Sequence, residues 1–339
     1  MDAVMREYGL ESIIKLASNE CPYPPFEPVL EAIESRIGDL NRYPDNDYFA
    51  IRSALATHLG VDRDSVWVGA GSSEVLRTMA LAVGGPGTSA VFAWPSFAMY
   101  PIATDVAGAE PIPVPLDANA AHDLDAMRDA VRADTTIVYL CNPNNPSGTI
   151  CGSDDVEAFV RALPDTVLVV IDEAYGEYAT DPRFEPALDL AMELPNVVWT
   201  RTFSKVYGLA GLRVGYAVGR PETMAEISKP QAPFVVSALA EAAAVEALKH
   251  QDLVAARVVE NDAERSRLEA AFADRGIPYA PSQTNFVMTG PFGDGRGIVE
   301  RLLTRGIITR PIGPAHVRVT VGTPDENRRL LEELGVFDD

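Results

Sequence analysis

Short apolar runs alternate with helical segments along residues 65–219 of this chain, and this alternation narrows the possible folds more than any other feature. The runs are rich in β-branched residues and are typical of buried strands; they lie at 65–68, 89–93, 135–140, 166–171, 196–200 and 213–219. Segments with helical periodicity lie between them, at 72–83, 124–132 and 154–163. This order predicts an α/β fold with a mainly parallel central sheet flanked by helices.

The pattern changes after Pro230. A long helical stretch at 237–276 is followed by apolar runs at 285–290 and 316–323 and by helical segments at 298–306 and 324–335. We interpret this part as a smaller α+β domain. The segment before residue 29 has too few elements to fold alone and is expected to pack with it. The sequence therefore predicts a large domain at 30–230 and a small domain formed by 1–29 and 231–339.

The charge balance excludes some classes of partner. Among 339 residues, Lys and Arg total 28 and Asp and Glu total 49, which gives a formal net charge of −21. A surface this acidic repels nucleic-acid phosphates and anionic lipids, so we expect neither nucleic acid nor a membrane as a partner. The first residues have no apolar signal-peptide core and no run approaches a membrane span, so the cytoplasm is the expected compartment.

Cysteine and histidine spacing gives no sign of a metal. The three cysteines form no C-x-x-C pair, and the four histidines are scattered without an H-E-x-x-H motif. We therefore expect no metal site.

Two loops follow predicted strands and have the composition of ligand-binding turns. The segment 69–74, GAGSSE, places Ser72 and Ser73 at the start of a helix, where free N–H groups and the helix dipole favour a phosphate. Capping of the helix by a serine is the alternative. In 141–148, CNPNNPSG, flanking prolines would hold the Asn145 amide rigidly near a ligand, although these residues also form ordinary connections.

Two later segments contain side chains that could take part in catalysis. Asp172 follows an uninterrupted apolar strand, so its carboxylate is expected at the carboxyl edge of the sheet, with Tyr175 three residues later. A helix-capping aspartate beside a surface tyrosine is the alternative. Lys205 follows another strand among apolar and hydroxyl side chains. A lysine that is partly desolvated or held near cationic groups has a lowered pKa and becomes nucleophilic. A solvated surface charge is the alternative.

These motifs together resemble the fold type I aminotransferases that depend on pyridoxal phosphate, within the class I and II aminotransferases. The resemblance is strongest to the histidinol-phosphate aminotransferase family and runs from about residue 11 to the end of the chain. The motifs that carry it are ASNE (17–20), NRYP (41–44), GSSE (71–74), NPNNPSG (142–148), DEAY (172–175), TFSK (202–205), GLAGLRVGY (208–216) and RVTVGT (318–323).

The resemblance implies a catalytic role for Lys205, Asp172 and Tyr175. Lys205 would bind the cofactor aldehyde covalently and move a proton during the reaction. Asp172 would pair with the ring nitrogen and keep it protonated, so that the ring accepts electrons. Asn145 and Tyr175 would hydrogen-bond the phenolic oxygen.

The other cofactor residues and the substrate residues also follow from the resemblance. Phosphate ligands would be Ser72, Ser73, Ser204 and Arg213, with the helix N-terminus after Gly71, while Thr202 would contact the cofactor and Phe97 would stack on its ring. Tyr43 would reach the phosphate of a neighbouring subunit, which implies a homodimer. Arg318 would bind the anionic group of the substrate, with Arg310 and Asn19 as further substrate residues.

The substrate and even the reaction stay open at this point. The resemblance favours transfer of an amino group from L-histidinol phosphate to 2-oxoglutarate, which yields imidazole acetol phosphate and glutamate in histidine biosynthesis. However, aromatic amino acid transaminases share every cofactor motif, and decarboxylases and oxidases use the same scaffold. The chain also begins late relative to the family and has Cys21 where a second Asn is usual.

Overall fold

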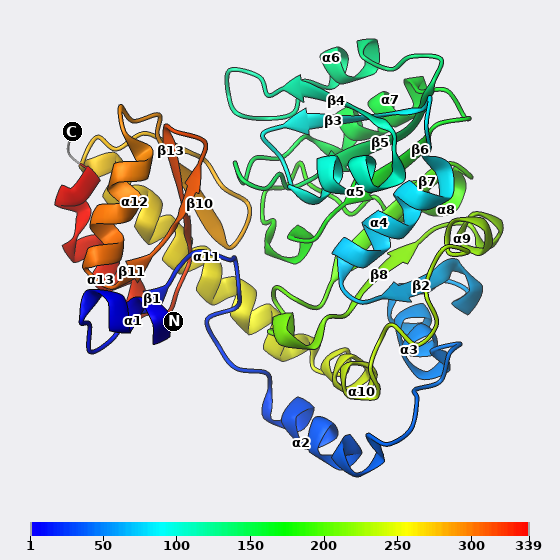
Figure 1. Cartoon of the computed structure of the whole chain (residues 1–339), viewed down its shortest axis with the longest axis horizontal. Coiled ribbons are helices and arrows are strands. Elements are labelled where there is room, and N and C mark those ends of the chain that lie inside the picture. The colour runs from blue at the N-terminus through cyan, green and yellow to red at the C-terminus, as the bar shows by residue number, and fades with distance from the viewer. Residues whose placement is uncertain (1, 338–339) are drawn as a thin grey trace.

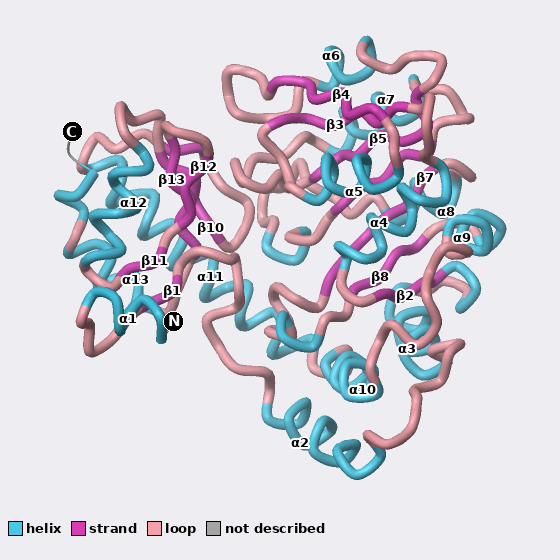
Figure 2. The backbone as a smooth tube through the Cα atoms, viewed as in Figure 1, coloured by secondary structure: helices cyan, strands magenta, loops and turns pink. Residues whose placement is uncertain are grey.

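A seven-stranded sheet forms the centre of the larger lobe of the computed structural model, which describes residues 2–337 (Figures 1 and 2). Its strands are, in spatial order, β2 (Val66–Gly69), β8 (Gly215–Val218), β7 (Val197–Thr202), β6 (Leu168–Asp172), β5 (Thr135–Cys141), β3 (Ser89–Trp94) and β4 (Glu110–Pro115). All run in one direction except β8, which pairs antiparallel with β2 and with β7. The predicted α/β class with a mainly parallel sheet is confirmed.

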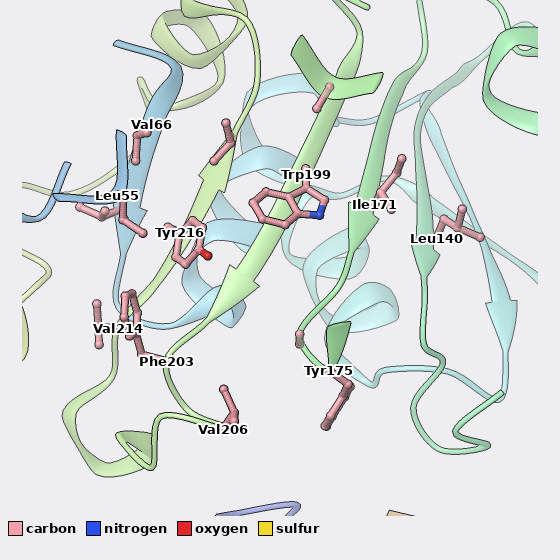
Figure 3. Close-up of a cluster of buried hydrophobic side chains, with 14 of the residues drawn as sticks. Leu55, Val66, Leu140, Ile171, Tyr175, Trp199, Phe203, Val206, Val214 and Tyr216 are labelled. Carbon is pink, nitrogen blue, oxygen red and sulfur yellow. The ribbon is translucent and has the colours of Figure 1, made fainter. Parts of the chain in front are cut away.

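Both faces of this sheet carry buried apolar side chains, because successive residues of each strand point to opposite faces. On β6, Ile171 belongs to one apolar cluster and Val170 to a second cluster on the opposite face. Figure 3 shows part of the first cluster, where Trp199 and Tyr216 from neighbouring strands meet edge to face. The helices of this lobe are α2 (Glu27–Arg36), α3 (Phe49–Leu59), α4 (Ser72–Val83), α5 (Met99–Ala107), α6 (Leu124–Asp129), α7 (Ser153–Ala162), α8 (Leu188–Glu193), α9 (Pro221–Ile227) and α10 (Ala238–Ala247).

Edge strand β4 and helix α5 were not predicted from the sequence. In β4 every second residue is proline: Pro111, Pro113 and Pro115. Because N–H groups alternate in direction along a strand, these prolines turn their donor-free nitrogens to one side, while Ile112 and Val114 remain able to donate to β3. Within sheets, proline is confined to edge strands, strand starts and bulges, so three prolines in six residues argued against a strand in the sequence.

The smaller lobe has two sheets of its own. An antiparallel sheet has the order β12 (Arg310–Ile312), β13 (His316–Thr320), β10 (Phe286–Thr289) and β9 (Tyr279–Ala280), and β1 (Ile14–Lys15) pairs in parallel with β11 (Ile307–Ile308). Its helices are α1 (Asp2–Tyr8), α12 (Gly295–Thr304) and α13 (Pro324–Glu332). The N-terminal segment therefore joins the C-terminal segment here, with Leu16 in the same apolar cluster as Val319.

The helical stretch expected at 237–276 is divided in two. Helix α10 ends at Ala247 and α11 (Gln251–Asp274) begins after a break at His250. Helix α10 packs against α2 and α3 beside the large sheet, whereas α11 crosses to the smaller lobe, where Leu268 and Phe272 enter its core (Figure 1). The position of a domain boundary at residue 230 stays a prediction.

Within residues 2–337, no helix combines the length and the apolar character needed to span a bilayer.

Candidate active site

The carboxyl ends of three neighbouring strands place an acid and an amine at one edge of the large sheet. Asp172 is the last residue of β6, and it is paired in register with Cys141 at the end of β5 and with Thr200 of β7. Lys205 follows β7 by three residues. Because parallel strands end at the same edge, their final residues and the loops after them form one site.

Asp172 is buried, yet both of its carboxylate oxygens have a hydrogen-bond donor. The Tyr100 hydroxyl donates to Oδ2 at 2.9 Å, and the backbone N–H of Ala174 donates to Oδ1 at 3.2 Å. Burial raises the pKa of Asp172, and the hydrogen bond from Tyr100 is the strongest influence that opposes this rise. Tyr100, which lies on α5, was not among the predicted site residues.

The Lys205 amine lies between the two lobes. Its Nζ donates to the Ser18 carbonyl at 3.4 Å and lies 5.3 Å from the centre of the Tyr175 ring. Burial, followed by the positive charge of Arg318, lowers the pKa of Lys205 to about 8. The neutral, nucleophilic share of this amine near physiological pH is therefore much larger than that of an ordinary exposed lysine, although the ammonium form still predominates below pH 8.

An inner cavity of about 260 Å³ brings most of the predicted cofactor residues together. Asp172 and Lys205 line it, and the other predicted residues on its wall are Ser72, Ser73, Phe97, Asn145, Tyr175, Thr202, Ser204 and Arg213.

One end of the inner cavity has the form of an anion site. Gly71 has φ +79°, and a Cβ atom there would lie 2.5 Å from Nη2 of Arg213. A Cβ on Gly215 would lie 2.4 Å from the backbone nitrogen of Ser72 at the start of α4. The guanidinium and the N-terminus of a twelve-residue helix thus approach each other only because both positions are glycine. A helix N-terminus beside an arginine is suited to a phosphate.

Tyr175 is held by a residue from the N-terminal segment. Asn19, with φ +54°, donates from Nδ2 to the Tyr175 hydroxyl at 2.9 Å. The Asn19 side chain is fixed in turn by Thr320 of β13, whose hydroxyl donates to Oδ1 at 3.1 Å. Burial raises the pKa of Tyr175, so its hydroxyl stays protonated and can donate or accept a hydrogen bond.

An outer cavity of about 790 Å³ opens from Lys205 towards the smaller lobe. Arg318 of β13 lies in its wall, where its Nη1 donates to the Asn145 side-chain oxygen and its Nη2 donates to the Ala17 carbonyl at 2.8 Å. Arg310 also lines this cavity and is the direct cross-strand partner of Arg318. Two guanidinium groups on adjacent strands therefore face one cavity.

Two further predicted residues take different positions. Phe97 lines both cavities. Tyr43 is absent from the walls of both: it is 81% exposed, and its ring stacks on Phe234 with a centroid distance of 4.6 Å. Its contact with the phosphate of another subunit stays a prediction.

A buried ion cluster supports the turn after Asp172. The guanidinium of Arg201 in β7 pairs with Glu173 at 2.8 Å and with Glu177 at 3.1 Å. A Cβ on Gly176 would lie 2.5 Å from Nη2 of Arg201, so glycine is needed for this approach. Removal of one partner would leave an uncompensated buried charge, so loss of Arg201 or Glu173 alone is expected to destabilise the segment that carries both Asp172 and Tyr175. Among the side chains that the structure describes, no group of His, Cys, Asp or Glu is arranged to hold a metal ion.

Comparison with known proteins assigns the chain to a family. The model of the aminotransferase class I and II family matches residues 11–334. The chain belongs to this family. The predicted resemblance to fold type I aminotransferases is confirmed, and the chain is an aminotransferase that uses pyridoxal phosphate with an amino donor and a 2-oxo acid.

Similar proteins have two different names. A histidinol-phosphate aminotransferase of Nitrosococcus oceani is 42% identical over 339 residues, which cover 98% of this chain and 91% of that protein. An aromatic amino acid aminotransferase of Cutibacterium acnes is 42% identical over 324 residues, covering 96% and 92%. The crystal structure of histidinol-phosphate aminotransferase from Sinorhizobium meliloti in complex with pyridoxal-5'-phosphate has a TM-score of 0.92 at 32% identity and covers 99% of this chain and 94% of that one.

The residues present fit this cofactor. The inner cavity has an amine of lowered pKa, a buried carboxylate and an anion site formed by Gly71, Ser72 and Arg213. These groups match the aldehyde, the ring nitrogen and the phosphate of pyridoxal phosphate.

The lowered pKa of Lys205 leads to a direct test on the cofactor-free chain. When the protein is labelled with trace acetic anhydride across a pH series, the modification of Lys205 should rise with a midpoint near pH 8. In Arg318→Gln the midpoint should move to higher pH, because a like charge that disfavours the ammonium form is removed. Peptide mass mapping measures the label at each lysine. A midpoint near 10.5 in the wild type would contradict the account of burial.

Proposed function

We propose that the enzyme transfers the amino group of L-histidinol phosphate to 2-oxoglutarate. The observation that carries this proposal is the pair Arg310 and Arg318, which are adjacent in register and line the same cavity as Lys205. Two guanidinium groups complement a dianionic phosphate better than one does. Several relatives at 41–43% identity, including proteins from Nitrosococcus oceani and Methylococcus capsulatus, are named histidinol-phosphate aminotransferases.

Lys205 would hold the cofactor and then act as the proton carrier. Pyridoxal phosphate, when bound, supplies an aldehyde that takes up the amino group and a ring that accepts the electrons left on the substrate carbon. The amine of Lys205 is suited to the covalent attachment because a large part of it is neutral near pH 8. The same amine would also be placed to remove a proton from the substrate carbon and return it.

The other cofactor residues would fix the orientation of the ring. Asp172 would pair with the ring nitrogen from within the sheet edge. Asn145 and Tyr175 would contact the phenolic oxygen, and Phe97 would lie on the ring face. The phosphate would lie at Gly71, Ser72, Ser73, Ser204 and Arg213, beside Thr202. Asn19 would act through its hydrogen bond to Tyr175 at the substrate side of the site.

An aromatic amino acid is the second candidate donor. The outer cavity has the apolar side chains of Trp94, Phe97 and Ile312 in its wall, which offer a surface for a phenyl or phenol ring. The Cutibacterium acnes relative, as similar as those named for histidinol phosphate, is an aromatic amino acid aminotransferase. Arg318 alone would then bind the donor carboxylate.

A donor panel distinguishes the two candidates. With saturating 2-oxoglutarate, kcat/KM for L-histidinol phosphate should exceed that for L-phenylalanine by about 10–100-fold, the value of a hydrogen bond to a charged group. In Arg310→Gln, kcat/KM for the phosphorylated donor should fall while that for phenylalanine changes little. The rate of glutamate formation gives kcat/KM for both donors in the wild type and in the variant. A wild-type preference for phenylalanine would overturn the proposed donor and support the second candidate.

We also propose that two copies of the chain form the working enzyme. Tyr43 is highly exposed and stacks on Phe234, and the large apolar side chains Ile37, Leu40 and Phe49 are also exposed. All of these except Phe234 come from one segment, 37–49, and a segment with this many exposed large apolar side chains is typical of an interface. A second copy on this face would bring Tyr43 towards its partner's phosphate site.

The oligomeric state tests this interface. Sedimentation equilibrium should give twice the 36.5 kDa mass of the chain, and Leu40→Asp should shift the mass towards the monomer. Tyr43→Phe should retain the dimer but bind the cofactor less tightly, because only the hydroxyl is lost. A wild-type monomer with full transaminase activity would contradict the proposal.

A further inference from the structure

We infer that Tyr100 is a positioning residue for transamination: its hydroxyl fixes the Asp172 carboxylate, in ionised form, towards the ring nitrogen of the cofactor. The inference rests on the role proposed above for Asp172. Nothing in the motifs or in the names of the relatives assigns a role to this tyrosine.

The contact itself is short and wholly inside the protein. The Tyr100 hydroxyl lies 2.9 Å from Oδ2 of Asp172, and both residues are buried. The other oxygen accepts a hydrogen bond from the Ala174 N–H at 3.2 Å. A carboxylate has about four acceptor positions, so these two donors fix its plane and still leave a lone pair for a donor in the cavity. Asp172 lines that cavity, as required.

Aromatic packing holds Tyr100 in place before any ligand arrives. Its ring stacks on Tyr139 of β5 with a centroid distance of 4.7 Å and an interplanar angle of 13°. On another side it meets Phe97 edge to face at 5.8 Å. Phe97 lines the cavity, so one aromatic cluster supports both the residue proposed to lie on the cofactor ring and the donor to its charge partner.

The surroundings of Asp172 make this one hydrogen bond important. Cys141 of β5, Tyr175 and Lys205 are the other titratable groups that influence Asp172. Burial raises the pKa of Asp172, and among the opposing influences Tyr100 ranks ahead of Ala174 and Lys205. Burial also raises the pKa of Tyr100 itself, so this hydroxyl remains a neutral donor. Without it, a buried carboxylate would favour the protonated form and lose its attraction for a positively charged ring nitrogen.

The chain supplies a matched control within the same aromatic stack. Tyr139 is buried like Tyr100, but its hydroxyl has no hydrogen-bond partner in the structure. Tyr100→Phe and Tyr139→Phe therefore remove the same atom from neighbouring rings, and only the first removes a donor to Asp172.

The experiment compares these two holoenzymes with the wild type by the pH dependence of the cofactor absorbance, by cofactor affinity and by kinetics. Tyr100→Phe should shift the midpoint of the absorbance titration, weaken cofactor binding and lower kcat about 10–100-fold, while KM for the donor changes little. Tyr139→Phe should match the wild type in all three. In an Asp172→Asn background, Tyr100→Phe should have little further effect, because the two residues act as one unit.

The outcomes separate this inference from the proposed function. The absorbance titration needs no amino donor, so it reports on the pairing of Asp172 even if the donor is wrong. If the wild type transaminates but Tyr100→Phe and Tyr139→Phe have the same spectrum and kcat, the inference fails and the proposed function stands. A loss of thermal stability in Tyr100→Phe without a spectral shift would also overturn it, since it would show a structural role only.

Discussion

A buried carboxylate at the carboxyl edge of a parallel sheet is the constraint on which the rest of the site depends. An isolated charge at this depth would cost several kcal/mol and would be neutralised by a proton. Asp172 avoids this because Tyr100 and Ala174 each donate to one of its oxygens. Among the residues that the structure describes, the Asp172 carboxylate still lacks a positively charged partner on the side that lines the inner cavity, and a protonated ring nitrogen bound there would supply one.

The site is completed by the contact between two lobes. Asp172 and Lys205 come from the larger lobe, whereas Asn19 and Arg318 come from the N- and C-terminal segments that form the smaller one. Arg318 donates to Asn145 across this boundary, and Asn19 donates to Tyr175. The charge of Arg318 also lowers the pKa of Lys205. Lobe packing therefore influences both the surroundings and the protonation of the Lys205 amine.

The sequence predicted what depends on local pattern and missed what depends on distant packing. The apolar run before Asp172 placed that residue at a sheet edge, but the role of Lys205 needed the family motifs, since a single lysine carries no periodic signal. Tyr100 was missed because its partner is 72 positions away. The break between α10 and α11 was missed because the Ala-rich stretch contains no helix breaker there. Helix α10 packs on α2 and α3, whereas the far end of α11 packs in the smaller lobe.

The central claim is that one lysine amine is joined to the cofactor opposite Asp172. The most direct measurement is borohydride reduction of the holoenzyme followed by peptide mass mapping, with the other lysines of the chain, Lys15, Lys229 and Lys249, as internal controls. The account predicts a stable pyridoxyl group on the peptide that contains Lys205 and unmodified peptides for the other three. A label on another lysine, or no label at position 205 in an active preparation, would contradict it.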